Sequence, residues 1–341
     1  MKNWNIKNIE EFIEQLEVTK NGLITSVKDD NKKKYYGDSI VIPKKNGERI
    51  IYSVNKNNSL YKIQKKLKEK YLDNIYLPDT VYGFVKKRSF FDYLAEHACN
   101  YGEYYLSIDI SNFFDSIKEE HINDAFNNIF LQSDVKEEII DYLKKILLYE
   151  GRLPQGSPCS PVVSNIIMRR LDIRIERYCT KVNVKYTRYA DDMMFSSVDK
   201  YIHTDRFYHG IEGILKSEGF NLNYKKKRLS KDYIALNGMV LSGGISLSRK
   251  RLKKIGAVLF TLERNKYNKK IKIKTWLDEI NGALKDIGYE HNFSSKEALI
   301  YFLAGYRSFV IQVLKSSPNN DGNKKLKNII TRIEKQIDIL V

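Results

Sequence analysis

The sequence predicts an α+β fold followed by a helical C-terminal domain. Short apolar runs of strand length alternate with amphipathic segments of helical period as far as residue 247, which is typical of α+β domains. From Ser248 onward the period is mostly helical. The charge changes at the same point, because residues 249–341 carry 20 basic and 9 acidic side chains in a chain of net charge +17. We therefore expect two parts that differ in architecture and charge.

The first predicted elements are a helix, a hairpin, a second helix and a strand. Residues 6–18 and 60–72 repeat apolar side chains at helical spacing. Residues 38–52 hold two β-branched runs on either side of the turn 44–47, which indicates a hairpin. The apolar run 104–110 has the length of a buried strand.

The later elements continue this alternation. A loop rich in Gly, Pro and Ser spans residues 151–161; it suits either a rigid turn between domains or a low surface that a nucleotide can approach. The predicted elements are helices at 118–130 and 135–148, a helix from Val162 toward Tyr178, strands at 184–188 and 193–197, a helix at 204–218 and a strand at 233–240. We expect the polar segment 316–325 to be a mobile loop.

Composition excludes several classes of protein. No apolar run approaches the roughly 18 residues that span a bilayer, and the N-terminus lacks the apolar core of a signal peptide. Cys99, Cys159 and Cys179 are scattered, which fits a reducing cytoplasm and neither a disulfide framework nor a zinc site. The basic charge suits a nucleic-acid partner or simply a lysine-rich soluble surface. We expect a cytoplasmic protein without a membrane partner.

Three aspartates are candidate metal ligands. Asp191 and Asp192 are adjacent between two apolar strands, where an ordinary turn would also explain them. Asp109 ends an apolar strand 82 positions before Asp191. Together they suggest carboxylates gathered at the ends of neighbouring strands, and such oxygen ligands suit Mg²⁺. A pair of Mg²⁺ ions roughly 3.5–4 Å apart can clamp the attacking and leaving oxygens of a phosphoryl transfer.

The chain resembles reverse transcriptases over roughly residues 35–260. The segments that carry the three aspartates and the Gly-Pro-Ser loop look like motifs A, B and C of that family, in the family's order. Further segments are similar to motif D, the primer-grip strand and two motifs of the fingers. The matching segments are Ser-Ile-Asp-Ile-Ser-Asn-Phe-Phe at 107–114, Leu-Pro-Gln-Gly-Ser-Pro at 153–158, Tyr-Ala-Asp-Asp at 189–192, and residues 218–227, 236–240, 45–51 and 82–84.

Within that family the chain is most similar to bacterial retron-type enzymes and their defence-associated relatives. The run from Tyr186 to Asp192 and the segment 303–309 carry this likeness. Two segments depart from the retron pattern. Residues 93–97 keep only the histidine of Asn-Ala-x-x-His, and Leu-Asn-Gly at 236–238 replaces Val-Thr-Gly. A defence-associated reverse transcriptase outside the retrons therefore stays open.

The resemblance implies a right-hand polymerase fold with fingers, a ferredoxin-like palm and a helical thumb. The fingers are expected at 36–100 and 118–160, and the palm at 101–117 and 161–247. A basic helical thumb is expected at 248–341, after an N-terminal helical extension at 1–35.

The resemblance also implies the roles of the site residues. Asp109 and Asp191, with the backbone carbonyl of Ile110, are expected to hold two Mg²⁺ ions, and Asp192 completes the catalytic triad. Phe114 is expected to be a steric gate against ribonucleotides, and Phe113 a core residue. Lys226 matches the motif D lysine that protonates pyrophosphate, although Lys225 and Lys227 compete for that role. The full expected nucleotide-binding set is Lys45, Arg49, Ser111, Asn112, Phe113, Phe114, Gln155, Gly156 and Lys226.

The start of the thumb carries a basic run that the resemblance assigns to nucleic-acid binding. A solvated helix face would carry the same charges, and Tyr306 suits either an RNA contact or the core. The expected nucleic-acid-binding residues are Arg249, Lys250, Arg251, Lys253, Lys254 and Tyr306.

The resemblance implies an RNA-directed DNA polymerase that copies a dedicated structured noncoding RNA in antiphage defence. The expected partners are that RNA as template and primer, its DNA product, dNTPs and an effector protein encoded nearby. A non-catalytic RNA-binding scaffold is the alternative from another class, and the intact aspartates argue against it.

Overall fold

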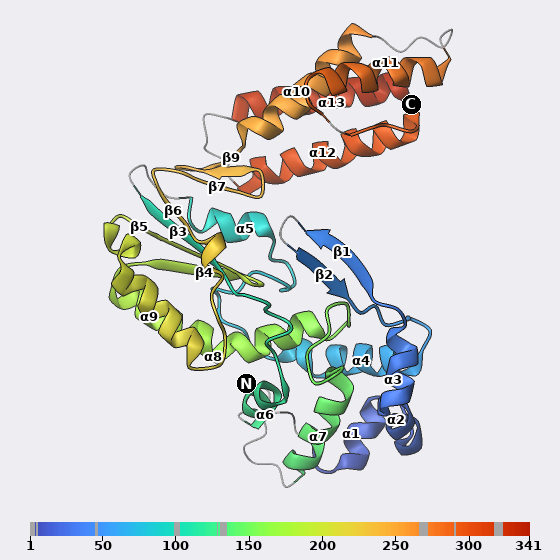
Figure 1. The fold of residues 1–341 in the computed structure, drawn as a ribbon, viewed down its shortest axis with the longest axis vertical. Coiled ribbons are helices and arrows are strands. Elements are labelled where there is room, and N and C mark those ends of the chain that lie inside the picture. Colours follow the sequence, from blue (N-terminus) through green and yellow to red (C-terminus); the bar gives the residue numbers. More distant parts are fainter. Residues whose placement is uncertain are drawn as a thin grey trace. The chain divides into compact units, whose positions relative to one another are not determined.

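The computed structural model describes residues 4, 6–44, 47–98, 103–127, 129, 135–265, 272–289, 291–316 and 323–341. The chain forms two compact units (Figure 1). The first contains Met1–Ser89 and Leu106–Arg228, and the second contains Phe90–Tyr105 and Leu229–Val341.

The N-terminal segment contains three short helices, α1 (Ile9–Gln15), α2 (Lys20–Val27) and α3 (Asp29–Tyr36). The single helix predicted over 6–18 is therefore shorter than expected. Glu17 has a φ of 56°, a left-handed conformation that ends a helix. Thr19 then caps α2, because its hydroxyl accepts a hydrogen bond of 3.1 Å from the Gly22 amide. The apolar face of α1 is buried as predicted.

The elements that surround this segment follow the predictions within a few residues. The predicted hairpin forms in antiparallel register, with Val41 opposite Ile50. The elements are β1 (Ile40–Lys44), β2 (Gly47–Ile51), α4 (Ser59–Lys70), η1 (Leu72–Asn74), α6 (Glu119–Asn127) and α7 (Lys136–Leu147).

A four-stranded sheet with the order β4-β5-β3-β6 forms the palm. When α6, α7 and the short 3₁₀ turns are left out, the elements follow one another as β3, α8, β4, β5, α9 and β6, which is the ferredoxin-like arrangement that was expected. Helices α8 and α9 pack against each other beside the sheet (Figure 1). The elements are β3 (Tyr104–Asp109), α8 (Ser160–Lys181), β4 (Lys185–Tyr189), β5 (Asp192–Ser197), η2 (Lys200–His203), α9 (Asp205–Lys216), η3 (Tyr224–Lys226) and β6 (Arg228–Lys231).

The single strand predicted over 233–240 was wrong. The chain forms a three-stranded antiparallel sheet of β7 (Ile234–Leu236), β8 (Met239–Leu241) and β9 (Ile245–Leu247). Asn237 and Gly238 make the turn between the first two strands with φ values of 49° and 82°. An Asn-Gly pair with two positive φ angles is the sequence signal of a tight hairpin, and it was overlooked.

The second unit has a helical core formed by α10 (Arg249–Arg264), α11 (Ile273–Asp286), α12 (Lys296–Ser316) and α13 (Asn323–Leu340). Trp276 and Leu303 are among its buried residues. Helix α5 (Phe90–Ala95), which the sequence did not predict, packs on α12 with the Phe91 and Phe309 rings 5.5 Å apart. Most of the loop predicted at 316–325 lies outside the described residues.

By length and composition alone, α12 could cross a membrane, contrary to the expectation that no segment would qualify. Its surroundings favour a simpler interpretation. Leu299 and Leu303 are buried in the helical core, and Arg307 forms an ion pair of 2.6 Å with Glu334 on α13. We interpret α12 as a helix that packs one face into the helical core.

Candidate active site

The turn between β4 and β5 presents two of the three predicted aspartates. Tyr189 pairs with Asp192 across the hairpin, so Ala190 and Asp191 form the turn itself. Ala190 has a φ of 58°, a conformation that costs free energy for any residue except glycine. Neighbouring groups must therefore hold this turn in place.

A buried ion pair supports the turn from below. The Arg188 guanidinium donates to both carboxylate oxygens of Asp172 on α8, at 2.8 and 2.7 Å, and neither side chain is exposed to solvent. A third guanidinium nitrogen donates to the Ala190 carbonyl at 2.9 Å. Tyr186 also donates to Asp172 at 2.8 Å. Arg188 thus connects the Ala190–Asp191 turn to α8.

Gly83 packs directly beneath the same turn. A Cβ atom at this position would lie 2.3 Å from the Ala190 nitrogen, so no larger residue fits. The Tyr82 amide donates to the Arg188 carbonyl at 2.8 Å. The resemblance predicted that Tyr82 and Gly83 belong to a fingers motif. It did not predict the pairing of Arg188 with Asp172. The sequence does carry a signal for this pair, because Arg188 places a positive charge in an apolar strand and Asp172 places a negative charge in an amphipathic helix.

Asp109 lies beside this turn at the end of β3. The Ile110 amide donates to the Asp191 carbonyl at 3.0 Å, which joins the two segments through their backbones. Burial and the neighbouring Asp191 raise the pKa of Asp109, although Lys226 opposes this shift. Burial, followed by the charges of Asp191 and Asp109, raises the pKa of Asp192 to about 6. The three predicted aspartates therefore form one electrostatically coupled group.

Lys226 is the lysine that faces this group. Its ammonium lies 2.7 Å from an Asp109 carboxylate oxygen. Although burial opposes protonation, the hydrogen bond and charge of Asp109 raise the pKa of Lys226 overall. Lys226 therefore carries a proton beside the carboxylates at neutral pH.

The carboxylates of Asp109, Asp191 and Asp192 suit a divalent cation whose other ligands are water or substrate oxygens. Within the described ranges, no three carboxylate, histidine or cysteine side chains form a metal-binding group by themselves. Mg²⁺ commonly takes one or two protein carboxylates and completes its shell with waters and substrate phosphates. A bound cation would offset both the burial and the mutual repulsion that raise the pKa values of Asp109 and Asp192. The residues therefore fit the implied metal.

The predicted nucleotide-binding residues near Asp109 divide into buried and accessible ones. Phe113 is buried and contacts Phe220, as expected of a core residue. Phe114 is half-buried, and its ring lies 6.3 Å from the exposed ring of Phe84. Asn112 has a φ of 47° and Ser111 precedes it, so both lie in the sharp turn after β3.

The remaining nucleotide-binding predictions lie on the fingers hairpin and the Gly-Pro-Ser loop. Arg49 is exposed on β2, and Lys45 lies outside the described residues. The Gln155 carbonyl accepts a hydrogen bond of 2.6 Å from the Tyr52 amide. A Cβ atom on Gly156 would lie 2.6 Å from the Tyr52 carbonyl oxygen, and Gly156 has a φ of 112°. Packing against Tyr52 is thus sufficient to require this glycine.

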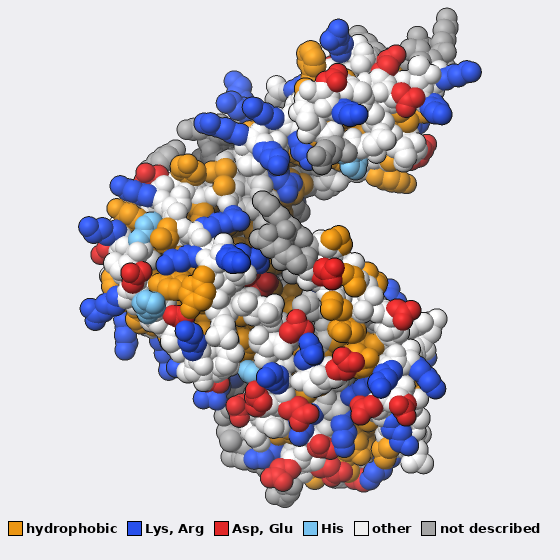
Figure 2. Space-filling model, in the orientation of Figure 1, with side chains coloured by type: hydrophobic (Ala, Val, Ile, Leu, Met, Phe, Trp, Pro, Cys, Tyr) orange, Lys and Arg blue, Asp and Glu red, His pale blue; other side chains and the backbone are white. Residues whose placement is uncertain are grey.

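The second unit contains the predicted nucleic-acid-binding residues. Lys and Arg side chains gather around the start of α10 (Figure 2), where Arg249, Lys250 and Lys253 are exposed. Arg251 instead stacks on Phe309 at 4.4 Å and donates to the Asn237 carbonyl at 3.1 Å. The Lys254 ammonium lies 4.3 Å from the centre of the Tyr289 ring. Tyr306 is half-buried, and its hydroxyl donates a hydrogen bond of 2.9 Å to the Arg251 carbonyl.

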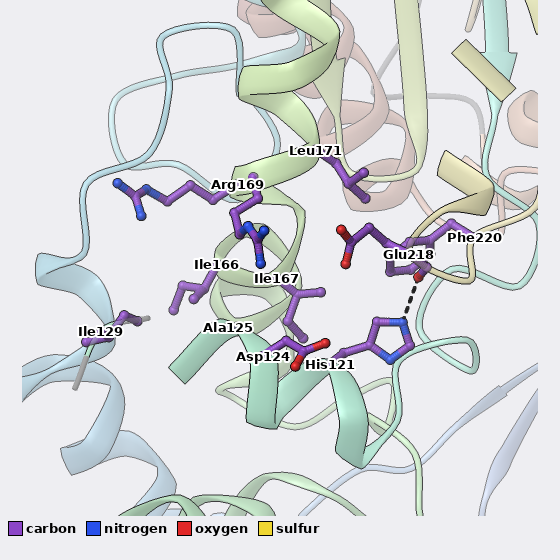
Figure 3. Close-up of a pocket in the computed structure, with 11 residues that line it drawn as sticks. His121, Asp124, Ala125, Ile129, Ile166, Ile167, Arg169, Leu171, Glu218 and Phe220 are labelled. Carbon is purple, nitrogen blue, oxygen red and sulfur yellow. Dashed lines mark hydrogen bonds between the residues drawn. The ribbon is translucent and has the colours of Figure 1, made fainter. Parts of the chain in front are cut away.

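A small cavity of about 30 Å³ lies between α6, α8 and the segment after α9 (Figure 3). Glu218 and Phe220 line it from the motif D segment. Its polar wall includes the hydrogen bond of 3.0 Å between His121 Nε2 and the Glu218 carbonyl. The cavity contains none of the predicted site residues, and its contacts anchor the segment that leads to Lys226.

A protein-family comparison matches residues 42–256 to reverse transcriptase (RNA-dependent DNA polymerase). Several curated proteins are similar to the chain. The Retron Ec86 reverse transcriptase of Escherichia coli is 27% identical over 312 residues, which cover 84% of each chain. The Retron Ec73 reverse transcriptase of Escherichia coli is 32% identical over 46% of this chain and 52% of its own length.

Solved structures that are similar to this chain include a telomerase from Candida albicans in complex with a TWJ fragment of telomeric RNA. It is 13% identical, with a TM-score of 0.49, and the match covers 88% of this chain and 63% of that one.

Proposed function

Because the chain belongs to the reverse transcriptase (RNA-dependent DNA polymerase) family and is of the retron type, we propose that it copies one structured noncoding RNA into DNA. Family membership establishes an RNA-directed DNA polymerase with an RNA template and a divalent-metal requirement. The structured nature of that RNA, a two-Mg²⁺ mechanism and a role in antiphage defence belong to the proposal.

The coupled carboxylates at the end of β3 and in the β4–β5 turn carry the proposal. The Asp109 and Asp191 segments are joined by a backbone hydrogen bond, and Lys226 supplies a positive charge to the same group. A scaffold that only bound RNA would not need carboxylates whose burial and mutual repulsion raise their pKa values. The arrangement suits a reaction in which negative charge develops on phosphate oxygens.

We assign each residue a role in nucleotidyl transfer. Asp109, Asp191 and the Ile110 carbonyl would hold the metal ions, and Asp192 would support the primer end. Two bound ions supply charge stabilisation for the attacking and leaving oxygens. The primer 3′ hydroxyl loses its proton to water and its oxygen bonds to the α-phosphorus of the dNTP, while the bond from that phosphorus to the bridging oxygen breaks. Lys226 gives its proton to the departing pyrophosphate.

The proposed partners follow from the charges and from this reaction. Exposed cations at the start of α10, Arg249, Lys250 and Lys253, suit phosphate contacts along a duplex that is read by its shape. The substrates are the RNA and dNTPs, and the product is complementary DNA. We also propose an effector protein encoded nearby and a cytoplasmic location. Buried free thiols at Cys159 and Cys179 agree with that location.

Sequencing of the bound nucleic acid tests the proposal. The protein is expressed with its native flanking DNA and purified at high salt, which weakens unselective phosphate contacts. We expect one dominant RNA, joined by complementary DNA for the wild type and absent for Asp191→Asn. A random mixture of cellular RNAs that washes off with salt would contradict a dedicated template.

A further inference from the structure

Three consecutive lysines near the active site have three different surroundings. Lys226 faces Asp109 at 2.7 Å. The Lys227 ammonium lies 3.7 Å from the centre of the Tyr208 ring on α9. Lys225 is exposed, and no hydrogen bond or ion pair joins it to another residue in the part of the chain that the structure describes. Local contacts must therefore determine which of the three lysines lies beside Asp109.

A second contact with α9 comes just before these lysines. The Tyr224 hydroxyl donates to the Glu212 carboxylate. Glu212 is held by Lys216 at 2.8 Å and contacts His209 at 3.1 Å, and only 6% of its surface is exposed. The Tyr224 ring itself is 59% exposed, so its hydroxyl provides the defined contact.

The two contacts lie on one side of η3. Side chains three residues apart eclipse each other in a 3₁₀ turn, so Tyr224 and Lys227 both point toward α9. The side chain of Lys226 must then point in another direction, which is where Asp109 lies. The preceding backbone is fixed separately, because the Asn223 amide donates to the Asp109 carbonyl at 2.8 Å. His121 holds Glu218 further upstream (Figure 3).

We propose that α9 positions the catalytic lysine, with Glu212–Tyr224 and Tyr208–Lys227 as the two halves of a clamp on η3. Tyr224, Tyr208 and Glu212 act through Lys226 and are therefore positioning residues. This inference rests on the proposed role of Lys226 in DNA synthesis. It predicts that Lys225 and Lys227 cannot replace Lys226.

The clamp is tested with Tyr224→Phe, which keeps the ring and removes only the hydroxyl. Single-turnover primer extension should show a maximal rate reduced roughly 10- to 100-fold, as expected when a reacting group is displaced by a fraction of an ångström to an ångström. The apparent dNTP affinity should stay within about twofold, because proton transfer matters only in the transition state. Tyr233→Phe is the matched control: Tyr233 is 58% exposed, and this variant should behave as wild type. Lys225→Ala should also do so.

A double-mutant cycle separates positioning from a general structural effect. In a Lys226→Ala background, Tyr224→Phe should change the rate by less than about twofold, because coupled residues are not additive. A full additional loss there, or an unchanged rate for Tyr224→Phe alone, would overturn the clamp.

Hydrogen exchange of the metal-free protein provides a readout that does not need activity. Amides of residues 224–227 should exchange faster in Tyr224→Phe than in wild type and Tyr233→Phe, and equal exchange would count against the clamp. An inactive wild type would refute the proposed function while this exchange measurement still decided the contact.

Discussion

At the scale of single residues, the adjacent side chains of Phe113 and Phe114 differ in burial and therefore in what each can contact. Phe113 is 3% exposed and packs against Phe220. Phe114 is half-buried and lies beside the exposed Phe84 at the end of β3. Only the second ring is accessible enough to contact the sugar of an incoming nucleotide.

Phe114→Ala should raise the incorporation of ribonucleotides relative to deoxyribonucleotides, since it removes the ring that would exclude a 2′-hydroxyl. Competition between matched dNTP and rNTP in primer extension measures this ratio. Phe113→Ala is the companion variant, and it should cost about 3–5 kcal/mol of unfolding free energy through the cavity it leaves. Equal sugar discrimination by wild type and Phe114→Ala would show that Phe114 is not the gate.

Glu212 gives a prediction about pH. Hydrogen bonds from Lys216, then Tyr224 and His209, lower its pKa to about 2. A carboxyl whose folded pKa is depressed stabilises the protein above its unfolded pKa, near 4.5, and loses that contribution as the pH falls toward 2. Glu212→Gln should therefore be less stable than wild type at pH 7. The gap should narrow between pH 4.5 and pH 2 in denaturant unfolding, and a gap independent of pH would contradict the assignment.

At the scale of elements, the β4–β5 hairpin depends on a charge pair in its interior. Arg188→Met should cost roughly 3–5 kcal/mol of unfolding free energy, because it leaves Asp172 buried without its partner. Arg174→Met offers a matched control on α8, since Arg174 makes an exposed ion pair of 3.5 Å with Glu218. That control should cost less than about 1 kcal/mol. Similar losses in the two variants, measured by urea unfolding, would rule out a special role for the buried pair.

Sequence patterns predicted most elements because their apolar periods were strong. The fingers hairpin, α7, α9 and the catalytic strands were found in this way. The break after α1 was missed because it depends on the backbone angle of Glu17, which periodicity does not report. The β7–β8 hairpin was missed although Asn237 and Gly238 signalled it.

Some features of the candidate active site could likewise be predicted from the sequence, and others could not. Asp109, Asp191 and Asp192 could be predicted, because each belongs to a short motif in a fixed order. The pairing of Arg188 with Asp172 could not, since it joins a strand to a helix and depends on tertiary packing. The choice of Lys226 from three lysines likewise required the position of α9. Contacts between elements therefore account for most of what the sequence left open.

At the scale of the whole molecule, the proposed catalytic residues and the basic start of α10 lie in different units. The carboxylates and Lys226 belong to the first unit, and the basic start of α10 belongs to the second. The chain carries a net charge of +17, so its affinity for RNA should fall steeply as salt rises. Selectivity for one RNA must then come from its shape and from unpaired bases.

We infer that Asp109, Asp191 and Asp192 catalyse RNA-directed DNA synthesis. Primer extension on an RNA template with Mg²⁺ tests this inference in the wild type, Asp109→Asn and Asp191→Asn. The control is Asp115→Asn, which changes an exposed carboxylate of the same segment. Thermal melting and RNA binding should stay nearly unchanged in all variants. We predict DNA synthesis by wild type and Asp115→Asn and none by the other two, because a lost metal ligand removes charge stabilisation needed in the transition state. Near-normal extension by Asp109→Asn or Asp191→Asn would contradict the assignment.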